Sequence, residues 1–379
     1  MTPRDLRAAI PALDETTFFN TGASGPSPQS VLDAATDCLT HHKATAPAAE
    51  GMYTAAREAR EASRETIAAH LGADPDEIAL TESTSDAISA LAAAVDWQPG
   101  DIVVRTDLEH PAGVLPWQRA ARTHGVEVRV VETTDGRVDL DAYAAAVDDA
   151  RLACFSSLSW NYGTRLPVAE LVEIAHDADC EVLVDAVQSA GQTPMDLDAW
   201  GAEYVAGSGH KWLLGPWGSG YLYVQEGSGE DLHPAQVCYN SVEEPGAAEY
   251  VLKKGAQKFE RGTASPAPHA GMAAAVDLFE SVGMETIESR IESLTDRLKS
   301  ALPGERLLSP AKFESGLVTI DVEEPEAVVE ALAADGIRIR SLPEPDAVRV
   351  SVHAFNTESE VDALLAALTA CGAVDRSEC

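Results

Sequence analysis

Apolar and polar residues follow two alternating patterns along residues 100–225. Short apolar runs, such as the one that ends at Asp185, predict buried strands. Between them lie stretches such as residues 168–178, where apolar residues recur at helical spacing. Strands that alternate with helices predict an α/β fold whose mostly parallel sheet is sandwiched by helices. The strands are expected at residues 102–104, 126–131, 153–156, 181–185, 204–206 and 220–224.

The pattern changes after residue 265. Two consecutive helices are expected near 269–282 and 284–302, and short strands mixed with helices follow them. This mixture is typical of a small α+β domain. We therefore divide the chain into an N-terminal arm, a large domain and a small C-terminal domain, onto which the N-terminal helix is expected to pack. The three parts span residues 1–30, 31–265 and 266–379.

Acidic residues dominate the charge of the chain. The 379 residues include 62 Asp plus Glu against 27 Lys plus Arg, a formal net charge of -35, while 45% of the residues are apolar. That apolar share is sufficient for a hydrophobic core, so the charge does not indicate disorder. A surface this negative disfavours nucleic acid and anionic membranes as partners. It predicts either a halophilic protein in a very salty cytoplasm, where ions screen the repulsion, or an ordinary acidic enzyme.

The cysteine pattern and the N-terminus add two exclusions. The six cysteines form no CxxC pair, which indicates neither a disulfide framework nor a zinc site. The first residues lack the apolar run of a signal peptide, and no apolar stretch is long enough to span a bilayer. We expect a cytoplasmic protein that binds no metal.

A lysine followed by a glycine-rich turn is the most distinctive motif. Lys211 is one of only seven lysines and lies in Ser208-Gly-His-Lys-Trp-Leu-Leu-Gly-Pro-Trp-Gly-Ser-Gly220, just after a predicted strand. Asp185 ends an earlier strand, and parallel sheets bind ligands at such strand ends. Taken separately, Lys211 suits a surface loop and Asp185 a helix N-cap. Taken together, they predict a ligand site.

These residues resemble the fold type I pyridoxal-phosphate (PLP) enzymes and, within them, the class V aminotransferase and cysteine desulfurase family. The resemblance implies that Lys211 forms a Schiff base with PLP and that Asp185 keeps the pyridine nitrogen protonated, so that the ring accepts electrons. It also implies that Lys211, once freed, is the general base at Cα of an amino-acid substrate. The neighbouring cofactor contacts that it implies are Gln188, Ser208 and His210.

Further segments carry the same resemblance over essentially the whole chain. Residues 20–28 resemble the family's substrate-side loop, and residues 81–88 its phosphate loop, where a helix N-terminus favours an anion. Residues 109–117 resemble the segment whose histidine stacks on the pyridine ring, here His110. Residues 258–263 resemble the segment whose threonine reaches the phosphate of the neighbouring subunit, which implies a homodimer. The implied phosphate contacts are Ser83, Thr84, Ser85 and, across the dimer, Thr263.

The substrate contacts are implied by two other segments. Residues 348–357 resemble the segment whose arginine binds the substrate carboxylate, here Arg349, although a surface ion pair is the alternative for this residue. Trp160 stands where desulfurases usually place an asparagine, which resembles the isopenicillin-epimerase-like branch. Asn161 supplies the amide if the alignment is one residue off.

The resemblance implies a PLP enzyme but leaves the reaction open. Transamination is the leading hypothesis. A lyase of the cysteine desulfurase or selenocysteine lyase type, an epimerase and a PLP-binding module without turnover are the alternatives. Desulfurases need a cysteine on the loop before the carboxylate-binding arginine, and this chain has none between Cys238 and Cys371. Cys238 is either a substitute nucleophile or a packing residue.

Two further arginines, Arg338 and Arg340, are expected on one face of the strand at residues 337–340. They could bind a second carboxylate, which would suit a dicarboxylic substrate. The alternative is that one of them pairs with an acid on the sheet.

Overall fold

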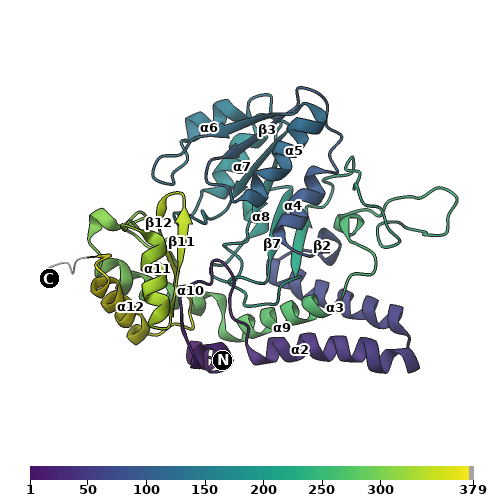
Figure 1. The fold of residues 1–379 in the computed structure, drawn as a ribbon. Coiled ribbons are helices and arrows are strands. Elements are labelled where there is room, and N and C mark those ends of the chain that lie inside the picture. The colour runs from purple at the N-terminus through teal and green to yellow at the C-terminus, as the bar shows by residue number, and fades with distance from the viewer. Residues whose placement is uncertain (375–379) are drawn as a thin grey trace.

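The computed structural model describes residues 1–374 and contains a central seven-stranded sheet (Figure 1). The strand order is β2-β8-β7-β6-β5-β3-β4. β8 runs antiparallel to both of its neighbours, β2 and β7, and all the other strand pairs are parallel, so the prediction of a mostly parallel sheet is confirmed. The strands are β2 (Ile78–Thr81), β3 (Ile102–Thr106), β4 (Glu127–Val131), β5 (Leu152–Ser156), β6 (Glu181–Asp185), β7 (Tyr204–Ser208) and β8 (Gly220–Val224).

Helices cover both faces of this sheet because successive strand residues point to opposite sides. Val103 and Leu183 pack in a core with residues of α4 (Thr84–Ala92) and α5 (Leu115–His124), whereas Val104 and Val184 pack in the core on the other face. No helix in the described part of the chain is long and apolar enough to span a membrane. The remaining helices that cross between strands are α6 (Leu140–Val147), α7 (Val168–His176) and α8 (Leu197–Trp200).

The C-terminal part has its own antiparallel sheet, with the strand order β11-β12-β9. Its core also contains residues of three helices. The N-terminal segment contacts this part, since β1 (Thr17–Phe18) pairs in parallel with β10 and Arg7 of α1 (Pro3–Ala8) forms an ion pair with Glu360. The elements of the C-terminal part are β9 (Leu317–Ile320), β10 (Ile337–Arg338), β11 (Arg340–Pro343), β12 (Asp346–Ser351), α10 (Met284–Ser300), α11 (Pro325–Ala334) and α12 (Glu358–Ala370).

The helix that follows residue 265 packs with the large part of the molecule. This helix, α9 (Ala267–Val282), lies beside α2 (Gln29–Thr40) and α3 (Met52–Leu71) (Figure 1). Phe279 of α9 belongs to the large core, whereas the core of the C-terminal part includes Leu294 of α10. The domain division at residue 265 stays a prediction, and this packing favours a boundary after α9.

Candidate active site

A cavity of about 170 Å³ lies where the carboxyl ends of the parallel strands meet the N-terminus of α4. It brings together residues that are far apart in the sequence, as the strand-end argument predicts. The predicted site residues that line it are Ser83, Thr84, Ser85, His110, Trp160, Asp185, Gln188, His210, Lys211 and Arg349. Other lining residues include Gly22, Ala23, Ala112, Val187, Trp217 and Arg340.

Lys211 and Asp185 both line the cavity, and each affects the pKa of the other. Burial lowers the pKa of Lys211 to about 8, and the nearby Arg349 and Arg340 contribute to this shift, while Asp185 opposes it. Asp185 is 3% exposed, and its Oδ1 accepts a hydrogen bond of 2.9 Å from the Val187 N–H. Burial raises the pKa of Asp185, against the effects of that hydrogen bond and of Lys211. The lysine therefore becomes a neutral amine at a pH much lower than usual for lysine.

The N-terminus of α4 forms one wall of the cavity. Ser83 is the N-cap, and its hydroxyl accepts a hydrogen bond of 3.1 Å from the Asp86 N–H. Thr84 donates to the Ser208 hydroxyl over 3.3 Å, and Ser208 Oγ is 2.9 Å from His210 Nδ1. Exposed N–H groups and the helix dipole at such a terminus favour an anion. The predicted phosphate residues therefore lie where a phosphate group would be stabilised.

Two arginines from the C-terminal part form the opposite wall. Arg340 of β11 and Arg349 of β12 are direct cross-strand neighbours. Arg349 is fully buried, and its Nη1 donates to the Trp160 carbonyl over 2.7 Å. Its Nε and Nη2 have no hydrogen-bond partner within residues 1–374. Because a Cβ at Gly22 would lie 2.9 Å from Nη2, only glycine lets the N-terminal loop approach this guanidinium closely.

Aromatic rings surround the cavity on two sides. The ring of His110 contacts Trp160 edge to face, with 5.4 Å between ring centroids. Burial lowers the pKa of His110 to about 4, assisted by the charges of Lys211 and two arginines, so the ring is neutral at pH 7. Trp217 is 75% exposed, and its Nε1 donates to Ser24 Oγ over 2.9 Å. Sequence reasoning missed Trp217, although it lies in the glycine-rich turn after the lysine.

Two residues considered in the sequence lie away from the cavity. The Asn161 amide donates to the Glu344 carbonyl over 3.3 Å, and its oxygen accepts from the Ser159 hydroxyl over 2.6 Å. Its role in substrate binding stays a prediction, which these contacts do not support. Arg338 is exposed on β10, and the chain passes to a different sheet at β11. The expectation that Arg338 and Arg340 share one strand is therefore wrong, and only Arg340 reaches the cavity.

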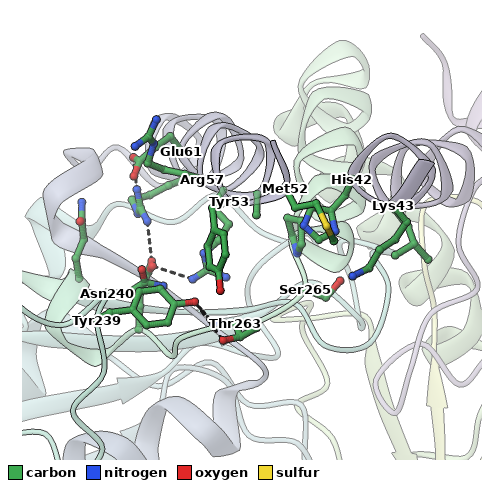
Figure 2. Close-up of a pocket in the computed structure, with 18 of the residues that line it drawn as sticks. His42, Lys43, Met52, Tyr53, Arg57, Glu61, Tyr239, Asn240, Thr263 and Ser265 are labelled. Atoms are coloured by element: carbon green, nitrogen blue, oxygen red, sulfur yellow. Dashed lines mark hydrogen bonds and ion pairs between the residues drawn. The ribbon is translucent and has the colours of Figure 1, made fainter. Parts of the chain in front are cut away.

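Thr263 lines a second, larger pocket of about 730 Å³ between α3 and the segment after β8. Figure 2 shows its side chain directed toward Tyr239, and the two hydroxyls are 3.2 Å apart. The Thr263 N–H also donates to the Tyr239 hydroxyl over 2.7 Å. Thr263 is thus placed outside the cavity that contains Lys211 of the same chain.

The first cavity has the groups that PLP requires. A lysine of lowered pKa suits the aldehyde, a buried carboxylate suits the ring nitrogen, and a helix N-terminus suits the phosphate. The two nitrogen atoms of the buried Arg349 that have no partner within residues 1–374 are also free to donate hydrogen bonds to an acceptor, and a carboxylate suits them. The arrangement is that of a PLP-binding site.

Comparisons with known proteins agree with this arrangement. The model of the aminotransferase class-V family matches residues 17–364, so the chain belongs to this family. The chain is 32% identical to a probable cysteine desulfurase of Methanothermobacter thermautotrophicus, over 96% of each chain. It is 30% identical to a probable cysteine desulfurase of Halobacterium salinarum, over 96% of this chain and 95% of the relative.

Solved structures show the same fold. A cysteine desulfurase from Thermococcus onnurineus has a TM-score of 0.90 and 28% identity, and the match covers 98% of each chain. The cystine C–S lyase C-DES, in complex with its reaction product cysteine persulfide, has a TM-score of 0.89 and 28% identity over 95% of this chain and 98% of C-DES. The protein is therefore a PLP-dependent enzyme that acts at Cα of a small amino acid, as the sequence predicts.

Proposed function

We propose that the enzyme is a C–S lyase that cleaves the Cβ–S bond of cystine or of a similar disulfide-linked amino acid. The observation that carries this proposal is the pair Arg340 and Arg349. Both line the cavity, and neither forms an ion pair with an acid within residues 1–374. Two adjacent guanidinium groups that have no acid partner suit a substrate with two carboxylates, and cystine is such a substrate. We therefore favour the lyase alternative over transamination.

The cysteines that the structure describes also support this proposal. No cysteine within residues 1–374 lines the cavity. The connection between β11 and β12 is a tight turn at Glu344-Pro345, too short for a mobile loop with a nucleophile. Cys238 lies elsewhere, where its Sγ contacts the Glu260 carbonyl at 3.2 Å. A substrate that has its own disulfide needs no thiol from the enzyme, because the sulfur leaves as a persulfide.

We assign the cofactor contacts according to the chemistry of each group. Lys211 would hold PLP covalently, Asp185 would pair with its ring nitrogen, and His110 would support its ring. Bound PLP withdraws electrons from Cα of the substrate. Because it is neutral above a pH of about 8, Lys211 can remove the Cα proton as a general base. The contacts assigned to the phosphate and to the cofactor's surroundings are Ser83, Thr84, Ser85, Gln188, Ser208 and His210.

Arg349 and Arg340 orient the substrate in this scheme. Arg349 binds the carboxylate on the reacting half and so places the Cα proton within reach of Lys211. Arg340 binds the carboxylate on the distal half. The sulfur then leaves Cβ with the electron pair of the C–S bond. The net reaction consumes one water and yields pyruvate, ammonium and cysteine persulfide, without an oxidant.

A substrate comparison tests this function. The holoenzyme is given cystine, cysteine, or alanine with a keto acid, and pyruvate and persulfide are measured over time. Catalytic release of both products from cystine is expected. The Arg340→Ala variant should raise KM for cystine about tenfold, the scale of one lost charge-assisted contact, and leave KM for alanine unchanged. Arg338→Ala is the matched control. Product only from alanine with the keto acid would instead establish an aminotransferase, and inversion at Cα an epimerase.

We also propose that the protein is a homodimer in which Thr263 reaches the phosphate of the partner's PLP. Thr263 lies in the second pocket, away from Lys211 of its own chain. Large aromatic side chains near it are exposed, namely Tyr53 at 78% and Tyr239 at 42%. A second copy that covered this face would bury them.

Mixing two defective variants tests this dimer. Lys211→Ala lacks the lysine, and Thr263→Ala lacks the phosphate contact, but a mixed dimer contains one site with both native residues. At limiting PLP, activity should appear only after the two variants are mixed. A monomer in analytical ultracentrifugation, or no gain on mixing, would contradict the proposal. A mixture of Lys211→Ala with the native protein controls for subunit exchange.

A further inference from the structure

The side chain of Glu109 is a buried carboxylate directly before His110, and it does not line the cavity. It is 6% exposed and accepts three hydrogen bonds. Thr106 Oγ1 donates over 2.7 Å, the Ser156 N–H over 3.1 Å and the Ser156 hydroxyl over 2.7 Å. Thr106 and Ser156 are the last residues of the adjacent strands β3 and β5. Glu109 thus joins the segment of His110 to two strand ends.

The turn that follows His110 closes over the same carboxylate. The Gly113 N–H donates to the His110 carbonyl over 2.8 Å, and the Ala112 N–H donates to His110 Nδ1 over 3.3 Å. A Cβ at Gly113 would lie only 3.3 Å from Oε2 of Glu109. The His110 ring is therefore held between an anchored residue on one side and a short turn on the other.

The choice of an acid at this position is costly. Burial raises the pKa of Glu109 to about 7, and the charge of Asp185 adds to the shift, while the hydrogen bonds from Ser156 and Thr106 oppose it. No lysine or arginine within residues 1–374 forms an ion pair with Glu109. An apolar residue would fill the same space without this cost. Only an acceptor with several lone pairs can bind the three donors together, which points to a role in placement.

We infer that Glu109 is the positioning residue that keeps His110 against the face of the PLP ring. It does so by fixing the His110 segment to the ends of β3 and β5. Ser156, which supplies two of the three donors, is the register partner of Asp185 on β6. Strand β5 therefore connects Glu109, which we assign to the placement of His110, with Asp185, which we assign to the ring nitrogen of PLP. This inference rests on the proposed role of His110.

A double-mutant cycle on PLP affinity tests the inference without any substrate. The dissociation constant of PLP is measured by its visible absorbance for the native protein, Glu109→Ala, His110→Ala and the double variant. Each single variant should weaken binding about tenfold, the scale of one lost buried contact. The double variant should bind no more weakly than His110→Ala, because Glu109 acts only through that ring. Glu109→Gln, which keeps acceptors for two donors, should bind PLP within about threefold of the native protein.

Different failures have different meanings. If the two losses multiply in the double variant, Glu109 acts independently of His110 and the inference is overturned. If His110→Ala leaves the PLP affinity unchanged, the proposed role of His110 fails and the inference fails with it. Neither result bears on whether cystine is the substrate.

Two milder variants cover the case in which Glu109→Ala does not fold. Ser156→Ala removes one donor, and Gly113→Ala presses a methyl group against the carboxylate. Thermal unfolding of each apoenzyme first establishes that the variant is folded. Both should weaken PLP binding in the native background and have no effect in the His110→Ala background. An equal effect in both backgrounds would overturn the inference.

Discussion

Two clusters of cationic side chains in this acidic protein differ in how their charge is balanced. In the pocket of Figure 2, Arg60 and Arg64 both pair with Glu260, over 2.7 Å and 2.8 Å. In the cavity around Lys211, Arg340 and Arg349 have no such acid partner within residues 1–374. Both clusters are largely removed from water, so the difference is not one of exposure.

This difference indicates that the first cluster stabilises the fold, whereas the second is available to bind a ligand. Burial alone would raise the pKa of Glu260, but Arg60 and Arg64 lower it below its usual range, so the acid stays ionised and the group is electrically satisfied. Arg60 and Arg64 each have one nitrogen atom without a hydrogen-bond partner within residues 1–374, but Glu260 neutralises their charge, whereas Arg349 has two such nitrogen atoms and no acid partner. Two such arginines side by side in one cavity, in a chain with 62 acidic and 27 basic residues, support the proposed binding of an anionic substrate there.

The largest expected effect is on Lys211. Lys211→Ala should abolish the visible absorbance of lysine-bound PLP and lower turnover by about 10⁴-fold, since the covalent anchor and the base are lost together. Absorbance spectra and product assays measure both quantities. The exposed Lys254→Ala is the matched control and should change neither. A variant that kept the absorbance band would place the reactive lysine elsewhere and remove the contrast between the clusters.

The second prediction concerns the paired cluster. Glu260→Gln should destabilise the fold by about 3–5 kcal/mol, because it leaves two buried guanidinium groups without their anion. It should leave KM of the refolded holoenzyme unchanged. Urea unfolding measures the first quantity and steady-state kinetics the second. Asp362→Asn, which breaks an exposed pair with Arg297, is the control and should hardly affect unfolding. A large rise in KM for Glu260→Gln would contradict this prediction, because it would show that the paired cluster also affects substrate binding.

The third prediction concerns the unpaired cluster. Arg349→Ala should lower kcat/KM for the amino-acid substrate by about a hundredfold, since a charge-assisted contact with the carboxylate is lost. Arg349→Lys should recover little of this loss because an ammonium cannot form the bidentate pair. Full recovery by lysine would show that only charge matters at this position. The exposed Arg338→Ala is the control in the same kinetic assay.

The smallest effect is a shift in the pH at which Lys211 reacts. Only the neutral amine combines with PLP, so the rate of reconstitution of the apoenzyme should rise with pH around a midpoint of about 8. Nearby cations disfavour the protonated amine, so Arg349→Ala should move the midpoint to higher pH. Asp185 favours the protonated amine, so Asp185→Asn should move it to lower pH. Shifts of the same sign in stopped-flow measurements would contradict this electrostatic account.

Some features of the site could be predicted because they follow from local patterns. Asp185 ends an apolar run that forms a buried strand, and Lys211 precedes a glycine-rich turn, so the sequence alone predicts both at one edge of the sheet. The hydroxyls at residues 83–85 begin a helix, which made them candidates for an anion site. In each case, the residues that determine the conformation are neighbours in the chain.

Other features depend on contacts between distant segments. Arg338 and Arg340 are two residues apart and share a strand pattern, but pairing with β1 and β12 assigns them to different sheets. Trp217 and Glu109 both lie in segments that the sequence singles out, but their contacts were not predictable, because their neighbours in space, Ser24 and Ser156, are far away in the sequence.

The sequence by itself determined the fold class, because periodicity is a local property, and its short motifs implied the PLP cofactor through their resemblance to a known family. Only the tertiary structure decided which arginines of the two clusters lack an acid partner within residues 1–374, which groups donate hydrogen bonds to Glu109, and that Thr263 lies outside the cavity that contains Lys211 of its own chain. The physical reason is that the burial of a side chain and its ion pairs depend on contacts with segments that are distant in the sequence. The residues next to an arginine in the sequence do not show whether an acid from a distant segment pairs with it in the fold. Glu260 pairs with Arg64 in this way, although the two residues are far apart in the sequence.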